Sequence, residues 1–310
     1  MGAASSSSPS QPADKHQAQQ GKARTMASDL RFHVHVADPT PEQGTPPVPH
    51  GYPAVASPIS STLVTGERDA VLVDTPWTHE HVRVIGDWIA SFEKNLIAIY
   101  ITHGHGDHWF GAPALLDRFP GAKVYATAGT AAYIGKQHQS RGARWEARFP
   151  GQVSEGEIHP EIIPGEGIEL EGNVLKAVEL GHTDTDDTTG LWVPSIRLFV
   201  AGDSVYNHCH QYLNESAGGG LQAWYRALDI IEALDPKYAV AGHKDKAKPD
   251  DGGAVQRTRT YLSTFQRLVE EGNRTPEEFF DEMMRLFPGY ANPKALWRSV
   301  VAVVGRPAAG

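Results

Sequence analysis

The chain has 310 residues, of which 40% are hydrophobic and 21% are charged, a composition typical of a folded globular protein. Its 28 basic and 37 acidic residues give a formal net charge of −9, which argues against nucleic acid or an anionic membrane as a partner. No apolar run reaches about 18 residues, so we expect no membrane span. The single cysteine, Cys209, excludes an internal disulfide and suits a reducing compartment, and we therefore expect a cytoplasmic protein.

The first 28 residues are rich in Ser, Gln, Ala and Pro and lack the apolar core of a secretory signal. We interpret residues 1–28 as a disordered leader or a non-native extension, because Met26 could be a natural start. Residues 39–58 are proline-rich and without periodic pattern, as expected for a long loop, and after about residue 59 strand and helix patterns mix without a linker. We therefore expect a single domain over residues 29–310, with C-terminal helices from about residue 254.

The first half of this domain contains clear local patterns. Strands are expected at 32–36 and, as a strand–turn–strand unit, at 60–74. Thr78 can cap a helix whose apolar residues share one face. The run 96–101 is apolar throughout, as expected for a strand that is covered on both faces.

The second half continues the alternation and ends in helices. Thr275 and Glu278 form a capping-box pattern around Pro276, which predicts the start of a C-terminal helix. The other expected strands are 123–126, 174–180, 191–193, 197–201 and 238–241, and the other expected helices are 112–119, 128–137, 221–234 and 258–271. Such a mixture is most simply arranged as β-sheets covered by helices.

Four side chains of the kinds that bind metals fall within residues 103–108, which read His-Gly-His-Gly-Asp-His. The two glycines tolerate backbone conformations closed to other residues, so this segment can turn tightly beside an ion. His103 and His105 can point the same way at the end of a strand, and Asp107 and His108 can then turn to a neighbouring point. Imidazole suits zinc, manganese or iron, and a carboxylate adds charge and a hard oxygen.

This motif resembles the hallmark of the metallo-β-lactamase superfamily, His-x-His-x-Asp-His. Further matches follow in the family's order, each after a predicted strand. They are Gly181-His182-Thr183, Ala201-Gly202-Asp203 and Gly242-His243, and Leu72-Val73-Asp74-Thr75 resembles an upstream motif. The resemblance covers about residues 60 to 245 and implies an α/β fold, the αββα metallo-β-lactamase sandwich, with the metal site at one edge of the sheets.

The same resemblance implies a dinuclear metal site. The expected ligands of the first ion are His103, His105 and His182, those of the second are Asp107, His108 and His243, and Asp203 bridges both. Asp74 is expected to support the site without binding metal. The expected cofactors are two divalent ions, with zinc as the first choice and manganese or iron as alternatives.

The bridging position also bears on the reaction. An aspartate at the bridging position, here Asp203, resembles the lactonases, thioesterases and nucleases of the family. The β-lactamases of the commonest class carry cysteine at that position. Two metal ions can generate hydroxide from a bound water at neutral pH, and Asp107 resembles the catalytic residue that orients this nucleophile and passes a proton to the leaving group. We therefore expect a hydrolase whose partner is a small-molecule carbonyl substrate, a lactone or lactam, opened by the metal-bound hydroxide.

Other reactions on the same fold are alternatives. One is hydrolysis of a thioester of the hydroxyacylglutathione type, and another is iron-dependent persulfide dioxygenation. A nuclease is disfavoured by the negative net charge. The chain fits either a monomer or a homodimer, and the C-terminal helices could cap the pocket or form a dimer face.

Candidate pocket residues lie close to the expected ligands in sequence, and each has an ordinary loop or helix-start role as its alternative. They are Trp77, His79, Tyr206, His208 and Tyr212. The residues after His182 depart from the Thr-Pro-Gly that the family often carries. Asp184, Asp186 and Asp187 stand there, either as solvated turn residues or as hydrogen-bond partners of His182.

Overall fold

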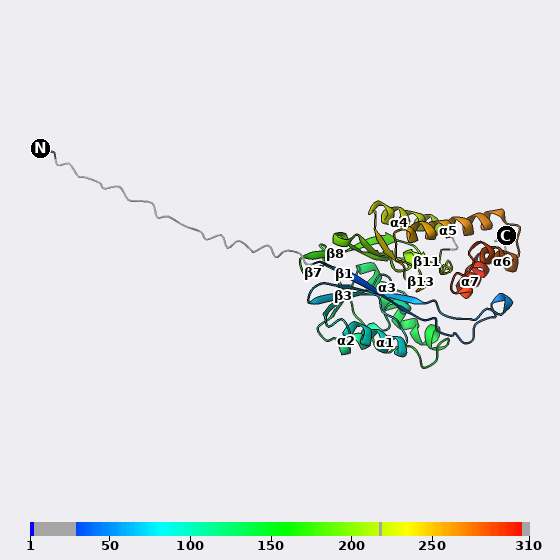
Figure 1. Ribbon diagram of the computed structural model, residues 1–310, viewed down its shortest axis with the longest axis horizontal. Coiled ribbons are helices and arrows are strands. Elements are labelled where there is room, and N and C mark those ends of the chain that lie inside the picture. The colour runs from blue at the N-terminus through cyan, green and yellow to red at the C-terminus, as the bar shows by residue number, and fades with distance from the viewer. Residues whose placement is uncertain (3–28, 217–218, 306–310) are drawn as a thin grey trace.

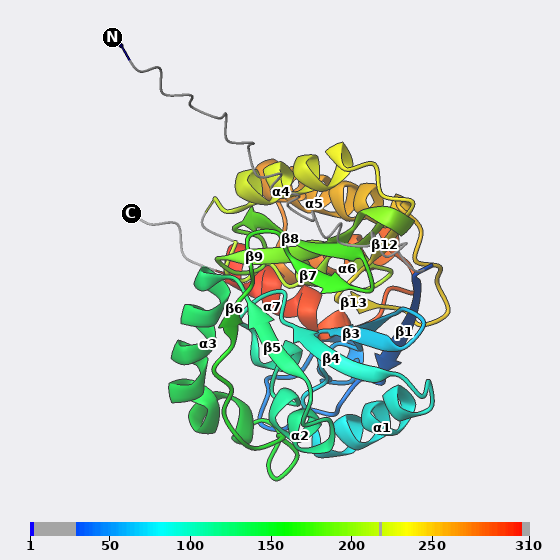
Figure 2. The same ribbon diagram turned by 90° about the vertical axis from the view of Figure 1, so that its left-hand side faces the viewer.

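The structure is a computed structural model that describes residues 1–2, 29–216 and 219–305. The expected leader therefore lies outside the described residues, apart from its first two. Two β-sheets lie face to face, and helices cover the outer face of each (Figures 1 and 2). This is the αββα sandwich that the sequence predicts.

The first sheet has eight strands and is built mainly from the N-terminal half of the chain. Its strands are β1 Arg31–Ala37, β2 Ile59–Thr65, β3 Asp69–Val73, β4 Asn95–Tyr100, β5 Lys123–Ala126, β6 Glu161–Ile162, β11 Tyr206–Asn207 and β13 His243–Lys244. Their order is β11–β13–β2–β3–β4–β5–β6, with β1 paired to β2. Because β3 and β4 are parallel, their carboxyl ends lie at the same edge of the sheet.

The second sheet has five strands in the order β12–β10–β9–β8–β7. They are β7 Ile168–Leu170, β8 Asn173–Gly181, β9 Thr188–Val193, β10 Leu198–Val200 and β12 Tyr238–Val240. The pair β10 and β12 is parallel, so this sheet also brings two carboxyl ends together.

The helices cover the outer faces of the two sheets, except that α6 and α7 lie at one end of the sandwich, as Figures 1 and 2 show. They are α1 His79–Ala90, α2 Ala112–Arg118, α3 Ala128–Arg141, α4 Leu221–Ala233, α5 Gly253–Glu271, α6 Pro276–Leu286 and α7 Pro293–Val303. In both views α1 and α2 lie on one side of the sandwich and α4 and α5 on the other, as Figures 1 and 2 show. None of the helices in the described ranges has the length and apolar character needed to cross a lipid bilayer.

Strand alternation explains why the central strands read as continuous apolar runs. In β3, Val71 and Val73 join the cluster between the two sheets, whereas Ala70 and Leu72 join the cluster beneath α1 and α2. All four side chains are buried. Since successive side chains of a strand point to opposite faces, a strand buried on both sides must be apolar at every position.

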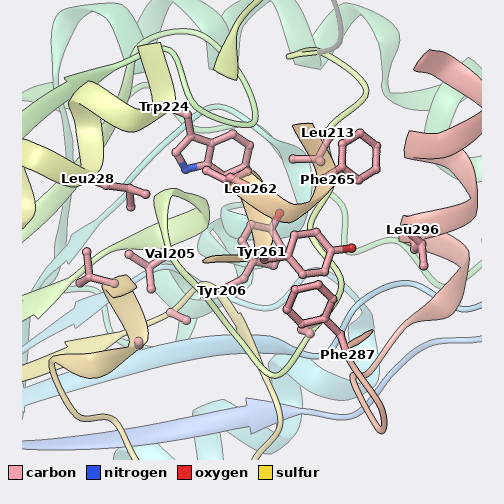
Figure 3. Packing of buried hydrophobic residues seen from close by; sticks show 14 of the residues in the cluster. Val205, Tyr206, Leu213, Trp224, Leu228, Tyr261, Leu262, Phe265, Phe287 and Leu296 are labelled. Carbon is pink, nitrogen blue, oxygen red and sulfur yellow. The ribbon is translucent and has the colours of Figure 1, made fainter. Parts of the chain in front are cut away.

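A third cluster lies between the second sheet and the C-terminal helices (Figure 3). Trp224 of α4 and Tyr261 of α5 pack there beside Tyr206, and the Trp224 Nε1 donates to the Ser204 carbonyl at 2.9 Å. Thr258 Oγ1 accepts from the Tyr206 backbone N at 3.0 Å. These contacts fix the segment that carries the predicted bridging aspartate.

Two of the helix starts follow the predicted capping chemistry. Thr78 Oγ1 accepts from the His81 backbone N at 3.1 Å. Thr275 and Glu278 exchange the two hydrogen bonds of a capping box, at 3.2 and 2.8 Å. The sequence patterns did not predict α7, which begins after Asn292, whose side chain accepts from the Ala295 backbone N at 3.2 Å.

Candidate metal centre

The predicted ligands meet at the edge of the sandwich where strands of both sheets end. Asp74 follows β3, and His103 follows its parallel neighbour β4 after two residues. Asp203 follows β10, and His243 comes soon after β12, which is parallel to β10. A crevice at the carboxyl ends of strands is the usual ligand-binding place in such sheets.

Two glycines of the ligand motifs permit the close approach of these segments. The Gly242 backbone N donates to the Gly202 carbonyl at 2.8 Å. A Cβ on Gly202, whose φ is +51°, would lie 2.4 Å from Thr102 Oγ1, and a Cβ on Gly242 would lie 2.2 Å from Asp203 Oδ1. Gly202, which precedes Asp203, and Gly242, which precedes His243, are therefore both required by packing at the site.

One group of potential ligands contains His103, His105, Asp184 and Asp203, whose donor atoms lie within 4.8 Å of one another. Asp184 Oδ2 lies 2.8 Å from His105 Nδ1 and 3.6 Å from His103 Nε2. This group corresponds to the first predicted ion, except that Asp184 stands in it and His182 does not.

The second group contains Asp107, His108 and His243, as predicted for the second ion. His243 Nε2 lies 3.6 Å from Asp107 Oδ2. Asp203 reaches both of the histidines, with Oδ1 3.2 Å from His108 Nε2 and Oδ2 3.0 Å from His243 Nε2. The Asp203 carboxylate thus lies between the two groups, where a bridging ligand belongs.

Hydrogen bonds on the far side of each ring set the tautomers of three histidines. His108 Nδ1 lies 2.8 Å from Asp74 Oδ2 and His243 Nδ1 lies 2.8 Å from a backbone carbonyl, so both Nδ1 atoms donate. His103 Nδ1 lies 3.0 Å from Thr102 Oγ1, whose only proton goes to Asp74 Oδ2 at 2.8 Å. Each Nε2 therefore presents a lone pair to the site, the form in which imidazole binds a metal.

The site also contains buried polar atoms that make no hydrogen bond of acceptable geometry among the described residues, although some lie close to one another. They are His103 Nε2, His108 Nε2, Asp184 Oδ2 and Asp203 Oδ1. Burying such atoms without partners costs free energy, and more for a charged carboxylate than for a neutral group. All four belong to the two ligand groups, so the donor set fits divalent metal ions.

Protonation at two positions favours the ligating forms. The pKa of His103 is lowered to about 3, because burial disfavours the imidazolium and His108 lies beside it. Burial alone would raise the pKa of Asp203, but the neighbouring His243 and His108 lower it well below the usual range of an aspartate. Burial lowers the pKa of these two histidines, but the Asp203 carboxylate outweighs it and raises both, so binding a metal at either Nε2 displaces a proton. A neutral imidazole and an ionised carboxylate are the species that bind metal.

His182 is not brought into either ligand group. Its Nδ1 lies 2.7 Å from Asp186 Oδ1 and its Nε2 lies 3.1 Å from Ser216 Oγ, so the ring is turned toward the segment before α4. The acidic residues after His182 were expected to be either solvated turn residues or hydrogen-bond partners of His182, and Asp184 and Asp186 differ in this respect. Asp186 is a partner of His182, whereas Asp184 is buried between the metal-ligand histidines.

Only one of the five candidate pocket residues lines the pocket over the metal centre, and that is Tyr212. Tyr206 is buried behind the site, where its Oη donates to Asp203 Oδ2 at 2.9 Å. Trp77 packs in the core against an aromatic cluster, because it precedes α1 and faces inward. His79 is exposed at the first turn of α1, and His208 packs on a tyrosine ring outside the pocket.

The pocket that opens on Asp107, Asp203 and His243 is walled by basic side chains from distant segments. Arg144 and Arg148 come from the segment after α3, and Lys294 and Arg298 come from α7. The basic residues were missed in the sequence, because no local pattern links the segment after α3 to the C-terminal helix. The expectation that the C-terminal helices could cap the pocket is met by α7, which supplies part of its wall.

The Asp74→Asn variant is expected to bind metal about 10–100-fold more weakly, since Asp74 orients both His108 and Thr102. Asn is suitable because Asp74 has a φ of +57°, a conformation that asparagine tolerates. Competition with a chromophoric chelator measures the affinity. Asp117→Asn, on the exposed face of α2, is the matched control, and equal affinities of the two variants would contradict the role of Asp74.

The comparison with protein families agrees with the geometry. A family model of the metallo-beta-lactamase superfamily matches residues 54–243. The chain therefore belongs to this superfamily of hydrolases, and its fold implies divalent metal ions at the donor groups described above.

Several known proteins are similar to the chain. Protein Rv0786c of Mycobacterium tuberculosis is 30% identical over 60% of this chain and 86% of its own length. A hydroxyacylglutathione hydrolase of Nostoc is 29% identical over 37% of this chain and 40% of its own length. An atrochrysone carboxyl ACP thioesterase of Aspergillus chevalieri is 23% identical over 76% and 70%. A solved metallo-beta-lactamase family protein of Thermus thermophilus, at 18% identity, shares the fold with a TM-score of 0.58 over 87% of this chain and 91% of its own.

Proposed function

We propose that the chain is a dinuclear metal-dependent hydrolase that cleaves an acyl thioester carrying a negatively charged group. The observation that carries the proposal is the basic wall directly beside the metal-ligand groups. Similarity to a hydroxyacylglutathione hydrolase and to an ACP thioesterase supports the thioester as the bond that is cleaved.

The charges of the pocket wall are only partly compensated. Glu42 accepts two hydrogen bonds from Arg148, at 2.7 and 2.8 Å, and also contacts Lys294. Arg144 lies 3.7 Å from a carboxylate oxygen of Glu215. Arg298 has no carboxylate within ion-pair distance in the part of the chain that the structure describes.

Two guanidinium groups of the wall, those of Arg148 and Arg298, carry positive charge into a partly buried space. Burial lowers the pKa of both Arg148 and Arg298, yet an arginine side chain remains protonated at neutral pH. A planar guanidinium matches a carboxylate or phosphate with two parallel hydrogen bonds. This wall is therefore suited to an anionic group of the substrate that lies beside the reacting carbonyl.

The protein side chains that face the reaction have distinct tasks. When bound, divalent ions supply Lewis-acid activation of water and of the substrate carbonyl. Asp107 lines the pocket with a partly exposed carboxylate, which can accept a proton from the attacking water and deliver it to the leaving sulfur. Tyr206 holds Asp203 through its Oη, and Trp145 and Tyr212 give the acyl group an aromatic wall.

A lactone or lactam is the second candidate substrate. It is favoured by Asp203, since an aspartate stands where the commonest β-lactamases of the superfamily carry cysteine. A cyclic ester offers the same carbonyl to Asp107 but gives the basic wall nothing to bind unless it carries an anionic substituent.

The test is acid release in weak buffer by protein loaded with zinc or manganese. The substrates are a glutathione thioester, an N-acetylcysteamine thioester with the same acyl group, a lactone, an aryl-fused lactam and a phosphodiester, with Asp107→Ala as the control. Preference for the glutathione thioester, lost in Asp107→Ala, is expected. Turnover of the lactone or lactam alone would select the second candidate. Silence on every carbonyl substrate, with oxygen uptake on a persulfide by iron-loaded protein, would overturn both.

The Arg298→Ala variant is expected to lose about 10–100-fold in kcat/KM for the glutathione thioester, because a hydrogen bond to a charged group contributes roughly 1.5–3 kcal/mol. The loss should appear mainly in KM and should be much smaller for the uncharged N-acetylcysteamine thioester. Arg298→Lys keeps the positive charge but lacks the planar guanidinium, so its kcat/KM for the glutathione thioester should lie between those of wild type and Arg298→Ala. Equal losses for both thioesters would argue against anion recognition by this residue.

A further inference from the structure

We propose that Asp184, and not His182, is the third protein ligand of the ion held by His103 and His105. The inference departs from the ligand set that the family resemblance implies. It concerns metal binding alone, so it stands or falls independently of the substrate.

The Asp184 side chain is fully buried and directed at two histidines. Its Oδ1 accepts from Thr183 Oγ1 at 2.9 Å, which leaves Oδ2 facing His105 Nδ1 at 2.8 Å and His103 Nε2 at 3.6 Å. Donors bound at about 2.0–2.2 Å to one ion lie roughly 3.0–3.6 Å apart, depending on the coordination geometry, which is close to this spacing. Neither Asp184 Oδ2 nor His103 Nε2 makes a hydrogen bond of acceptable geometry among the described residues, the 2.8 Å contact of Asp184 with His105 Nδ1 included. One ion would satisfy both atoms.

His182 has its contacts elsewhere. Both ring nitrogens are engaged, Nδ1 with Asp186 and Nε2 with Ser216. Ser216 Oγ is itself held by a hydrogen bond to the Thr183 carbonyl. Gly220 lies so close to the ring that a Cβ there would be 2.6 Å from His182 Nε2. Ser216 and Gly220 therefore hold His182 away from the two ligand groups.

The turn between β8 and β9 explains which of its side chains points inward. β8 ends at Gly181 with a φ of +77°, and β9 begins at Thr188. The Thr183 backbone N donates to the Thr185 carbonyl at 2.9 Å, and Thr188 Oγ1 donates to the same carbonyl at 3.1 Å. This tight loop closes over residues 183–188 and places Asp184 on its inner side.

The start of β9 is tied to the ligand segment itself. The Thr189 backbone N donates to the Thr102 carbonyl at 2.9 Å, and Thr189 Oγ1 donates to the same carbonyl at 2.6 Å. Thr102 is the neighbour of His103, so the register that positions Asp184 is fixed against the first metal-ligand histidine.

A carboxylate in place of an imidazole changes the chemistry of the first site. Two histidines with carboxylate oxygens form a harder donor set than three histidines, and such sets suit manganese or iron better. We therefore infer that this chain takes up manganese or iron at the first site more readily than a three-histidine site would.

The experiment measures metal content by mass spectrometry after metal-free protein is reloaded with manganese and desalted. The variants are Asp184→Ala, Asp184→Asn and His182→Ala, with Asp186→Ala as the matched control from the same turn. Circular dichroism before and after loading shows whether each variant is folded. We expect wild type, His182→Ala and Asp186→Ala to retain two ions per chain, and both Asp184 variants to retain one.

Any other pattern overturns the assignment. Loss of an ion from His182→Ala, alone or together with the Asp184 variants, would restore His182 as a ligand, and full retention by folded Asp184→Asn would exclude Asp184. A second measurement uses the Asp184→His variant. Reloaded from an equimolar mixture of zinc and manganese, it should hold a larger share of zinc than wild type does, and an unchanged share would contradict the inferred preference.

Discussion

The Asp203→Ala variant is expected to lose at least about 10³-fold in kcat/KM for the thioester, well beyond the roughly 10–100-fold cost of removing a residue that only orients a ligand. Asp203 approaches His108 and His243 together through its two carboxylate oxygens, at 3.2 and 3.0 Å. Without it the two ions would lose their shared ligand, and Tyr206 Oη would be buried without its acceptor. The expected loss is therefore one of metal binding and of activity together.

Steady-state kinetics and metal content, measured on the same preparation, check this expectation. Tyr206→Phe is an informative companion, because it removes only the hydrogen bond to Asp203 and leaves every metal ligand in place. It should retain both ions and lose much less activity. If Asp203→Ala held both ions and kept activity within tenfold of wild type, the bridging role would be wrong.

Most of the centre could be predicted from the sequence because strand ends and glycines are visible there. Six of the seven predicted ligands lie in the two groups. The glycines before Asp203 and His243 are explained by close contacts that a Cβ would break. These features are local, and the parallel pairing of β3 with β4 and of β10 with β12 then brings them to one edge.

The turn after His182 is a part of the site that local sequence patterns could not predict. Within six residues it carries His182, Asp184, Asp186 and Asp187, all of which could bind a metal. Which of them points inward depends on hydrogen bonds among the turn's threonines and on the pairing of Thr189 with Thr102. No periodicity in the sequence encodes that choice.

The pocket wall was unpredictable for a different reason. Glu42 and Lys294 are 252 residues apart in sequence yet form an ion pair. Glu42 lies in a proline-rich segment without periodic pattern, and Lys294 opens a helix that the sequence did not reveal. The pocket wall therefore depends on tertiary packing, whereas the two ligand groups depend on motifs.

The same ion pair carries the second large prediction. The Glu42→Ala variant is expected to lose about 3–5 kcal/mol of unfolding free energy, since removing one partner of a buried ion pair leaves the other charge uncompensated. The Glu42 side chain is 1% exposed and binds Arg148 through both oxygens as well as Lys294. For a protein of this size the loss corresponds to a fall in Tm of roughly 5–9 °C.

The chain offers a matched control for burial. Arg285 and Glu282 form a pair with the same two hydrogen bonds, at 2.8 and 2.7 Å, but on the exposed surface of α6. Glu282→Ala should change stability by less than about 1 kcal/mol, because water and salt screen such pairs. Thermal and denaturant unfolding of both variants, with metal loaded, tests the contrast. Equal losses would show that Glu42 does not hold the basic wall in place. The pairing of Glu42 with Arg148 and Lys294 would then not account for the charge balance of the pocket.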